Sequence, residues 1–196
     1  MFLLNHIILV ALWLLFGVLH SVLAAEWFKR MMQRRLGGGY KYYNFAYSVF
    51  AMFTLIGILI FQFNMESRLL YVAPNRVKLL LWLPVLAGLL IMAVVIKKYF
   101  FSLSGISVFY KHQPPVALEV GGLNRFVRHP LYFGTLLFVW GVFFVVPYLN
   151  NLLACIVITV YTIVGARLEE KKLVKQFGEQ YVLYKKQVPM LVPGLF

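Results

Sequence analysis

The sequence has few charged residues and very few acidic ones. Only 13% of its 196 residues are charged, and its six acidic residues are all Glu, with no Asp at all. A soluble domain of this length needs many more charges to cover its surface. Hydrophobic residues instead make up 62% of the chain. The composition therefore excludes an ordinary soluble protein and predicts an integral membrane protein.

Residues that hold metals or act as nucleophiles are also scarce. The single cysteine, Cys155, leaves no disulfide framework and lies in an apolar run, where we expect a small buried side chain. The four histidines show no paired metal-ligand spacing, so we predict no metal site. No Ser or Cys stands in a constellation that would activate it as a nucleophile.

Several apolar runs approach the roughly 20 residues that a membrane-spanning helix needs. The runs cover about residues 2–25, 44–63, 78–96, 131–146 and 150–166. We expect the first to be a retained helix rather than a signal peptide, because no basic segment precedes it. Pro84 lies in the first turns of the third run, where it is least disruptive. The fold class is therefore an all-α polytopic membrane protein, a single domain over residues 1–196 with about five transmembrane helices.

The connections between the runs differ in charge, and this asymmetry predicts the topology. Basic residues concentrate in the segments 26–43 and 97–129 and in the tail after Ala166, and few lie elsewhere. We therefore place the N-terminus outside, and the C-terminus and both basic loops in the cytoplasm. The net charge of +13 then reflects membrane orientation and not nucleic-acid binding. We expect the segment 26–43 to be a solvated loop, and the long connection 97–129 to be functional.

The segment after Ala166 is charged but keeps one apolar stripe. The stripe consists of Leu173, Phe177, Tyr181 and Tyr184. Such a pattern predicts a cytoplasmic C-terminal helix that packs back on the protein or the membrane surface.

The most informative stretch, residues 121–134, leads from a polar connection into the fourth apolar run. Pro130 suits the first position of a helix, because its missing N–H would be unpaired there in any case. Arg128 and His129 stand directly before it. A helix start with a nearby cation binds anions. The alternative is that Arg128 only anchors the helix at the membrane face.

An adenosyl cofactor would complete this pattern. Its carboxylate needs amides or a cation, its ribose hydroxyls need a carboxylate, and its adenine needs an apolar cleft. The helix start can supply the first need and Glu169 the second, while Leu118, Phe126 and Tyr132 can contribute to the third. The alternative for Glu169 and Glu170 is a pair of surface ion-pair partners on a helix.

The stretches RHPLYFG (128–134) and EEKKLVKQFGEQYVLYKKQVP (169–189) together resemble the C-terminal half of the membrane-bound isoprenylcysteine carboxyl methyltransferase family. The resemblance covers about residues 115–193. LHSVLAAEWFKR (19–30) and YKYYNFAYS (40–48) are similar to two bacterial branches, the methanethiol S-methyltransferases and the NnrU-like proteins. The resemblance implies S-adenosylmethionine as cofactor and a hydrophobic or membrane-accessible acceptor, either a lipid or a small thiol.

The resemblance also implies site residues. Cofactor-binding positions are Val116, Ala117, Leu118, Glu119, Asn124, Arg128, His129, Pro130, Leu131, Tyr132 and Glu169, and the catalytic candidates are Arg167 and Glu170. Asn124 stands where the family commonly has tyrosine. Gly165 stands where the prenylcysteine enzymes carry an arginine that binds the substrate carboxylate, which argues against such a substrate.

Two other functions fit parts of the pattern. Membrane sterol reductases share a segment like RHPLYFG and use NADPH, but the sequence lacks the Arg-Asp pair that they carry. The NnrU-like resemblance allows a non-catalytic carrier or assembly protein. We expect methyl transfer, with membrane lipid and an apolar substrate as partners and no nucleic acid.

Overall fold

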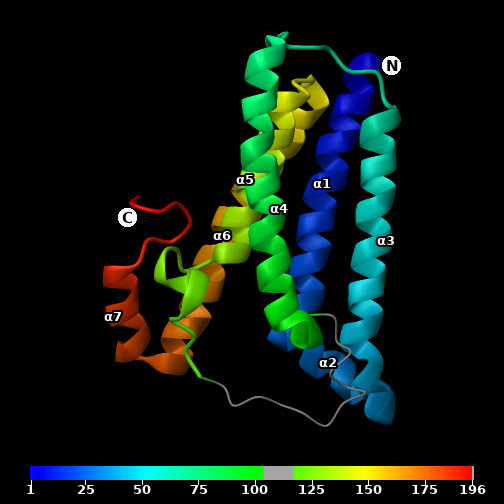
Figure 1. Cartoon of the computed structure of the whole chain (residues 1–196). Helices are drawn as coiled ribbons and strands as arrows, with labels where there is room; N and C mark the ends of the chain where they lie inside the picture. The colour runs from blue at the N-terminus through cyan, green and yellow to red at the C-terminus, as the bar shows by residue number, and fades with distance from the viewer. Residues whose placement is uncertain (104–116, 196) are drawn as a thin grey trace. The chain divides into compact units, whose positions relative to one another are not determined.

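The computed structural model describes residues 1–103 and 117–195, and these form helices and short 3₁₀ turns (Figure 1). In chain order the elements are α1 (Phe2–Ala24), α2 (Glu26–Leu36), η1 (Gly37–Tyr42), α3 (Tyr43–Asn64), α4 (Asn75–Leu103), η3 (Gly122–Arg125), α5 (Pro130–Val145), α6 (Leu149–Phe177) and α7 (Glu179–Gln187). Among the described residues, α1, α3, α4 and α6 provide four segments long and apolar enough to cross a membrane, and α5 is a shorter apolar helix. The predicted all-α membrane fold is confirmed.

Contacts along the chain divide it into two compact units. The first is built on Met1–Arg68, and the second on Leu69–Lys98 together with the C-terminal part of the chain. The interpretation of the whole chain as one domain stays a prediction.

In the first unit, α1 packs against α3 through polar side chains spaced seven residues apart. His6, Trp13 and His20 share one face of α1, because seven residues complete nearly two helical turns. Trp13 Nε1 donates to Gln62 Oε1 at 2.9 Å, and His6 Nε2 lies 3.3 Å from Ser67 Oγ. Tyr47 Oη lies 2.8 Å from His20 Nδ1. The Trp13–Gln62 and His20–Tyr47 pairs connect α1 to α3, and the His6–Ser67 pair connects α1 to the segment after α3.

Two expectations about local structure were wrong. The segment 26–43 is not a loop, because Glu26–Leu36 is helical and Gly37–Tyr42 is a 3₁₀ turn. Glu26 in the first turn of α2, and Arg34 and Arg35 in its last turn, match the charge preference of helix ends. Pro84 lies in the interior of α4, because that helix begins at Asn75, before the apolar run itself.

In the second unit, α5 and α6 form the predicted helical hairpin, and α4 packs closely on α5. Small residues allow this approach. A Cβ atom on Gly88 would lie only 2.6 Å from the Gly134 carbonyl oxygen, and one on Gly141 would lie 2.8 Å from a methyl group of Val85. Backbones in contact are typical of membrane helix packing.

The C-terminal helical stretch is divided at Gly178. The predicted apolar stripe of Leu173, Phe177, Tyr181 and Tyr184 is divided between α6 and α7. Gly178, with φ of +55°, ends α6 and turns the chain back. Tyr181, Tyr184 and Val188 form a buried cluster, against which four partly buried apolar residues pack: Leu118, Leu173, Val174 and Phe177. The predicted return of this segment onto the protein is therefore observed, through a turn and not along a single helix.

Candidate functional site

The start of α5 is the centre of the candidate site. His129 is the N-cap residue, Pro130 occupies the first turn, and no side chain from the described parts of the chain caps the helix. The backbone N–H of Arg128 donates to the Pro189 carbonyl at 2.9 Å, and that of His129 donates to the Met190 carbonyl at 3.2 Å. The segment after α7 therefore fixes the loop from which α5 begins.

Beneath this helix start lies a buried ion cluster. Arg128 Nε donates to Glu170 Oε1 at 2.6 Å, and Lys185 Nζ lies 3.0 Å from Glu170 Oε2. The side chains of Arg128 and Glu170 are only 8% and 7% exposed. The Arg128 guanidinium also donates to the carbonyls of Lys185 and Val188. Glu170 therefore has a cation at each carboxylate oxygen and is held ionised.

Glu169, the next residue, lies in a different environment. Its side chain is 48% exposed, and its Oε2 lies 3.6 Å from Nδ1 of the buried His129. Tyr132 also hydrogen-bonds to the Glu169 carboxylate. The Tyr132 ring stacks on His129, with ring centroids 5.5 Å apart and an interplanar angle of 21°. The two adjacent glutamates thus separate into an accessible carboxylate and a buried one.

Two polar atoms behind the accessible carboxylate lack a hydrogen bond among the described residues. These are His129 Nε2, which lies 3.5 Å from Glu170 Oε1, and the hydroxyl of Tyr181. Burial, together with the nearby Glu170 charge, raises the pKa of Tyr181 above its ordinary value. The first atom belongs to the residue that precedes α5, and the second belongs to α7. Both lie near the ion cluster, so polar groups surround the buried Glu170 carboxylate.

The loop before α5 is tied to α7. Asn124 Nδ2 donates to the Arg128 carbonyl at 3.3 Å, and the Tyr184 hydroxyl donates to the Asn124 carbonyl at 2.6 Å. Asn124, at the position where the family commonly has tyrosine, thus contributes to the shape of the loop.

The predicted loop 116–119 is only partly described. Val116 lies outside the described residues, Ala117 is exposed, and Leu118 packs against the Tyr181 cluster. Glu119 bonds Lys98 Nζ at 2.8 Å and accepts from the Gly121 N–H at 3.0 Å. The hydrogen bond from Lys98, followed by that from Gly121, lowers the pKa of Glu119. These contacts attach the loop to the end of α4.

Arg167 is exposed on α6 and is not brought to the accessible carboxylate. It precedes Glu169 by two residues, a rotation of about 200° on an α-helix, so the two side chains point to nearly opposite sides. Gly165 shares the face of Glu169, one turn earlier. A Cβ atom there would lie 3.6 Å from the Tyr132 hydroxyl.

Sequence reasoning missed Lys185, Pro189 and Met190. Their partners stand about 15 to 61 positions away in the chain, and no local pattern links them. The only signal was the run of basic residues followed by Val188-Pro189. In the described ranges, no group of three or more His, Cys, Asp or Glu residues could hold a metal ion.

Comparison with known proteins agrees with the two motifs. The family model "Phospholipid methyltransferase" matches residues 78–180. The methanethiol S-methyltransferase of Crocosphaera subtropica is 30% identical, with 91% of this chain and 71% of that protein aligned. That of Pseudomonas deceptionensis is 31% identical, with 92% of this chain and 70% of that protein aligned. Methanethiol S-methyltransferase 1 of Bradyrhizobium diazoefficiens is 29% identical, with 91% and 64% aligned.

No solved structure gave a significant match to the chain. The resemblance to membrane methyltransferases is nevertheless confirmed, since the family match covers more than half of the chain and includes both the α5 start and the glutamate pair. Together with its apolar helices, this match establishes that the chain belongs to the phospholipid methyltransferase family.

Proposed function

We propose that the second unit binds S-adenosylmethionine and transfers its methyl group to a small alkyl thiol. The observation that carries the proposal is the Glu169 carboxylate. It is half exposed, it is oriented by His129 and Tyr132, and it lies beside a helix start without a side-chain cap.

The residues present fit the cofactor. An accessible, oriented carboxylate is the acceptor that two ribose hydroxyls require, and Glu169 offers it. The first amides of α5 can bind the carboxylate of the methionine part. Because the Arg128 guanidinium is bound to Glu170 and to two carbonyls, we assign it a positioning role beneath the helix start. We assign the same role to Glu170, whose two oxygens each contact a cation.

Methyl transfer requires mainly that the protein positions the two reactants. When bound, S-adenosylmethionine supplies an electrophilic methyl group on a sulfonium. The protein must hold the acceptor sulfur in line with that methyl group and exclude water. The thiolate is the reactive form of a thiol, and a nearby cation favours it. Arg167 points away from Glu169, so we propose that it does not contact the cofactor or the reacting thiol.

A thiol fits better than a carboxylate acceptor. The three relatives compared above are named methanethiol S-methyltransferases, and each aligns over most of this chain. Gly165, on the face of Glu169, provides no cation for a substrate carboxylate and leaves space beside Tyr132.

Calorimetry and turnover test the proposal with the full chain in detergent. We expect S-adenosylhomocysteine to bind and NADPH not to bind. Ethanethiol with S-adenosylmethionine should give ethyl methyl sulfide, detected by gas chromatography. Folded protein that binds NADPH but not S-adenosylhomocysteine would support a reductase and refute the proposal. Label from radioactive S-adenosylmethionine that enters only the lipid fraction would exclude the thiol acceptor.

The exclusion of Arg167 from the mechanism has its own test. Arg167→Gln should keep the wild-type dependence of turnover on pH, because the Arg167 side chain points away from Glu169. A rise of turnover that moves to higher pH in Arg167→Gln, and returns to the wild-type pH in Arg167→Lys, would place the Arg167 charge next to the bound thiol.

We further propose that the site faces the cytoplasm. The basic segments 26–43 and 97–129 and the tail after Ala166 support this orientation under the positive-inside rule. Reporter domains fused to either end would test it. The proposal requires a cytoplasmic signal at the C-terminus and an external one at the N-terminus.

A further inference from the structure

The first unit contains an elongated pocket of about 300 Å³ between α1 and α3. Its lining runs from Leu12 to Leu23 on α1 and from Tyr47 to Ile58 on α3. Eleven residue steps on each helix correspond to a length of about 16 Å at 1.5 Å per residue. A space of this shape suits an extended chain better than a compact ring system.

The middle of the α3 wall of the pocket carries small side chains. Ala51, Thr54 and Gly57 follow one another at three-residue spacing and therefore share one face. The Thr54 hydroxyl donates to the Phe50 carbonyl of its own helix at 2.9 Å, so it does not direct a donor into the pocket. Among the described residues, no atom beyond the chain neighbours and own helix backbone of Gly57 lies within 4 Å of the place where its Cβ atom would be. The middle of the pocket is thus both apolar and open.

The polar side chains of the pocket lie at the end near α2. His20 and Tyr47 bond each other there, and the His20 ring stacks on Phe16 with centroids 5.8 Å apart. Tyr43, one turn before Tyr47, donates its hydroxyl to the Leu23 carbonyl at 2.8 Å. The pocket therefore runs from an apolar end to a polar end.

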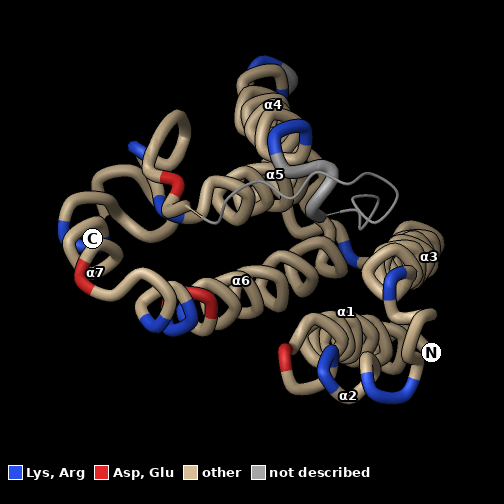
Figure 2. The backbone as a smooth tube through the Cα atoms, turned by 90° about the horizontal axis from the view of Figure 1, so that it is seen from below, with Lys and Arg blue, Asp and Glu red and all other residues tan. Residues whose placement is uncertain are grey.

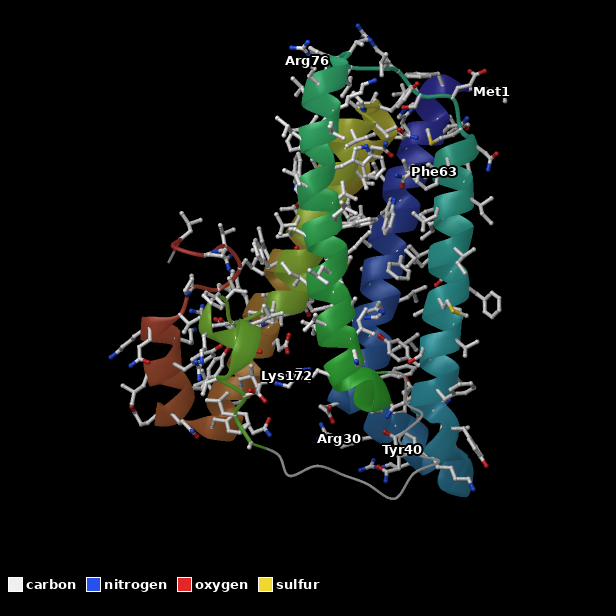
Figure 3. All side chains as sticks on the ribbon, viewed as in Figure 1. Met1, Arg30, Tyr40, Phe63, Arg76 and Lys172 are labelled. Atoms are coloured by element: carbon white, nitrogen blue, oxygen red, sulfur yellow. The ribbon has the colours of Figure 1, made fainter. Side chains whose placement is uncertain are left out.

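The helix α2 adjoins this polar end. The rings of Phe28 and Tyr43 lie 6.5 Å apart. Figure 3 shows Arg30 and Tyr40 at the end of this unit opposite to Met1 and Phe63. Positive charge gathers on α2 and η1 (Figure 2), from Lys29, Arg30, Arg34, Arg35 and Lys41 against the single Glu26.

We propose that this pocket binds one acyl chain of an anionic phospholipid, with the headgroup bound by the basic residues of α2. The apolar wall accepts the chain, and the His20–Tyr47 end lies at the level of the ester groups. The cations of α2 select the headgroup, since each Lys or Arg near an anionic lipid surface contributes about 1 kcal/mol, or about fivefold in affinity. The residues of this site belong to the first unit, whereas those of the proposed methyl-transfer site belong to the second.

Native mass spectrometry of the delipidated full chain in detergent tests the proposal. We compare phosphatidylglycerol and phosphatidylcholine with identical oleoyl chains. We expect phosphatidylglycerol to bind at least about 25-fold more tightly. Arg34→Gln with Arg35→Gln removes two cations, and it should weaken phosphatidylglycerol about 25-fold while leaving phosphatidylcholine unchanged.

Filling the pocket tests the place of the chain. Gly57→Phe should weaken both lipids at least tenfold, and Ala51→Leu is a milder second variant in case the first does not fold. Ile56→Phe places the same aromatic side chain at an exposed position outside the lining and should bind as wild type does. Wild-type binding by both filled variants would overturn the pocket assignment. Equal affinity of the wild type for the two lipids would overturn the phospholipid assignment. Displacement of bound phosphatidylglycerol by ethanethiol would also overturn it, because the pocket would then bind the thiol.

Discussion

The same substitution should affect the two adjacent glutamates of α6 differently: Glu170→Gln should lower stability, and Glu169→Gln should lower cofactor affinity. Glu170→Gln keeps the size of the side chain but removes the negative charge between Arg128 and Lys185, 2.6 Å and 3.0 Å away. Breaking a buried ion pair by removing one partner costs about 3–5 kcal/mol. Gln keeps one acceptor oxygen and Arg128 keeps two carbonyl partners, so we expect the lower end, about 3 kcal/mol. At about 2–4 °C per kcal/mol, the midpoint of unfolding should fall by about 6–12 °C.

Cys155 provides the assay. It is the only cysteine of the chain and is 2% exposed in α6, where its thiol donates to the Val139 carbonyl at 3.1 Å. A thiol-reactive dye that becomes fluorescent on coupling therefore reports unfolding of the second unit during heating. Lys185→Met should show a smaller loss than Glu170→Gln, because Lys185 is 38% exposed and Glu170 keeps its contact with Arg128.

Glu169→Gln is the matched control for stability and the test case for binding. Its half-exposed side chain predicts a change in unfolding of about 0–1 kcal/mol. A hydrogen bond to a charged group contributes about 1.5–3 kcal/mol, so its affinity for S-adenosylhomocysteine should fall about ten- to a hundredfold. Equal unfolding midpoints for the two variants would refute the buried ion cluster, and unchanged affinity in Glu169→Gln would refute the ribose contact.

Three further changes have definite expected results in the same dye assay. Gly88→Ala should destabilise the second unit by about 1–3 kcal/mol, because its Cβ would overlap α5, and an unchanged unfolding midpoint would contradict this close approach. Tyr184→Phe removes the 2.6 Å hydrogen bond to the Asn124 carbonyl and should cost about 1 kcal/mol; no change would mean that this bond does not hold the loop. Gly178→Ala forces a side chain into a φ of +55° and should cost about 1–3 kcal/mol, and a stable variant would contradict the turn between α6 and α7.

The sequence by itself determined the fold class and the local elements near the site. Long apolar runs specify membrane helices because backbone polar groups must bond within their own segment in lipid, whatever the neighbours are. Pro130 after Arg128-His129 likewise marked the start of α5, because the preference of proline for the first turn is local. Boundaries were less certain where helices extend beyond the membrane. The regions 26–36 and 75–77 are polar yet helical, because hydropathy does not detect helix outside lipid.

The tertiary structure alone decided which of two adjacent glutamates is buried. From the sequence, Glu169 was predicted to bind the cofactor and Glu170 was a catalytic candidate, but neither prediction said which carboxylate is buried. The two glutamates differ because residues one apart on a helix point about 100° apart, so one faces the cations Arg128 and Lys185 and the other faces His129 and Tyr132. Those partners come from a loop, from α5 and from α7. Contacts between residues so far apart in the chain depend on how the helices pack. Such packing produces no periodic pattern in the sequence, so the sequence could not predict these contacts.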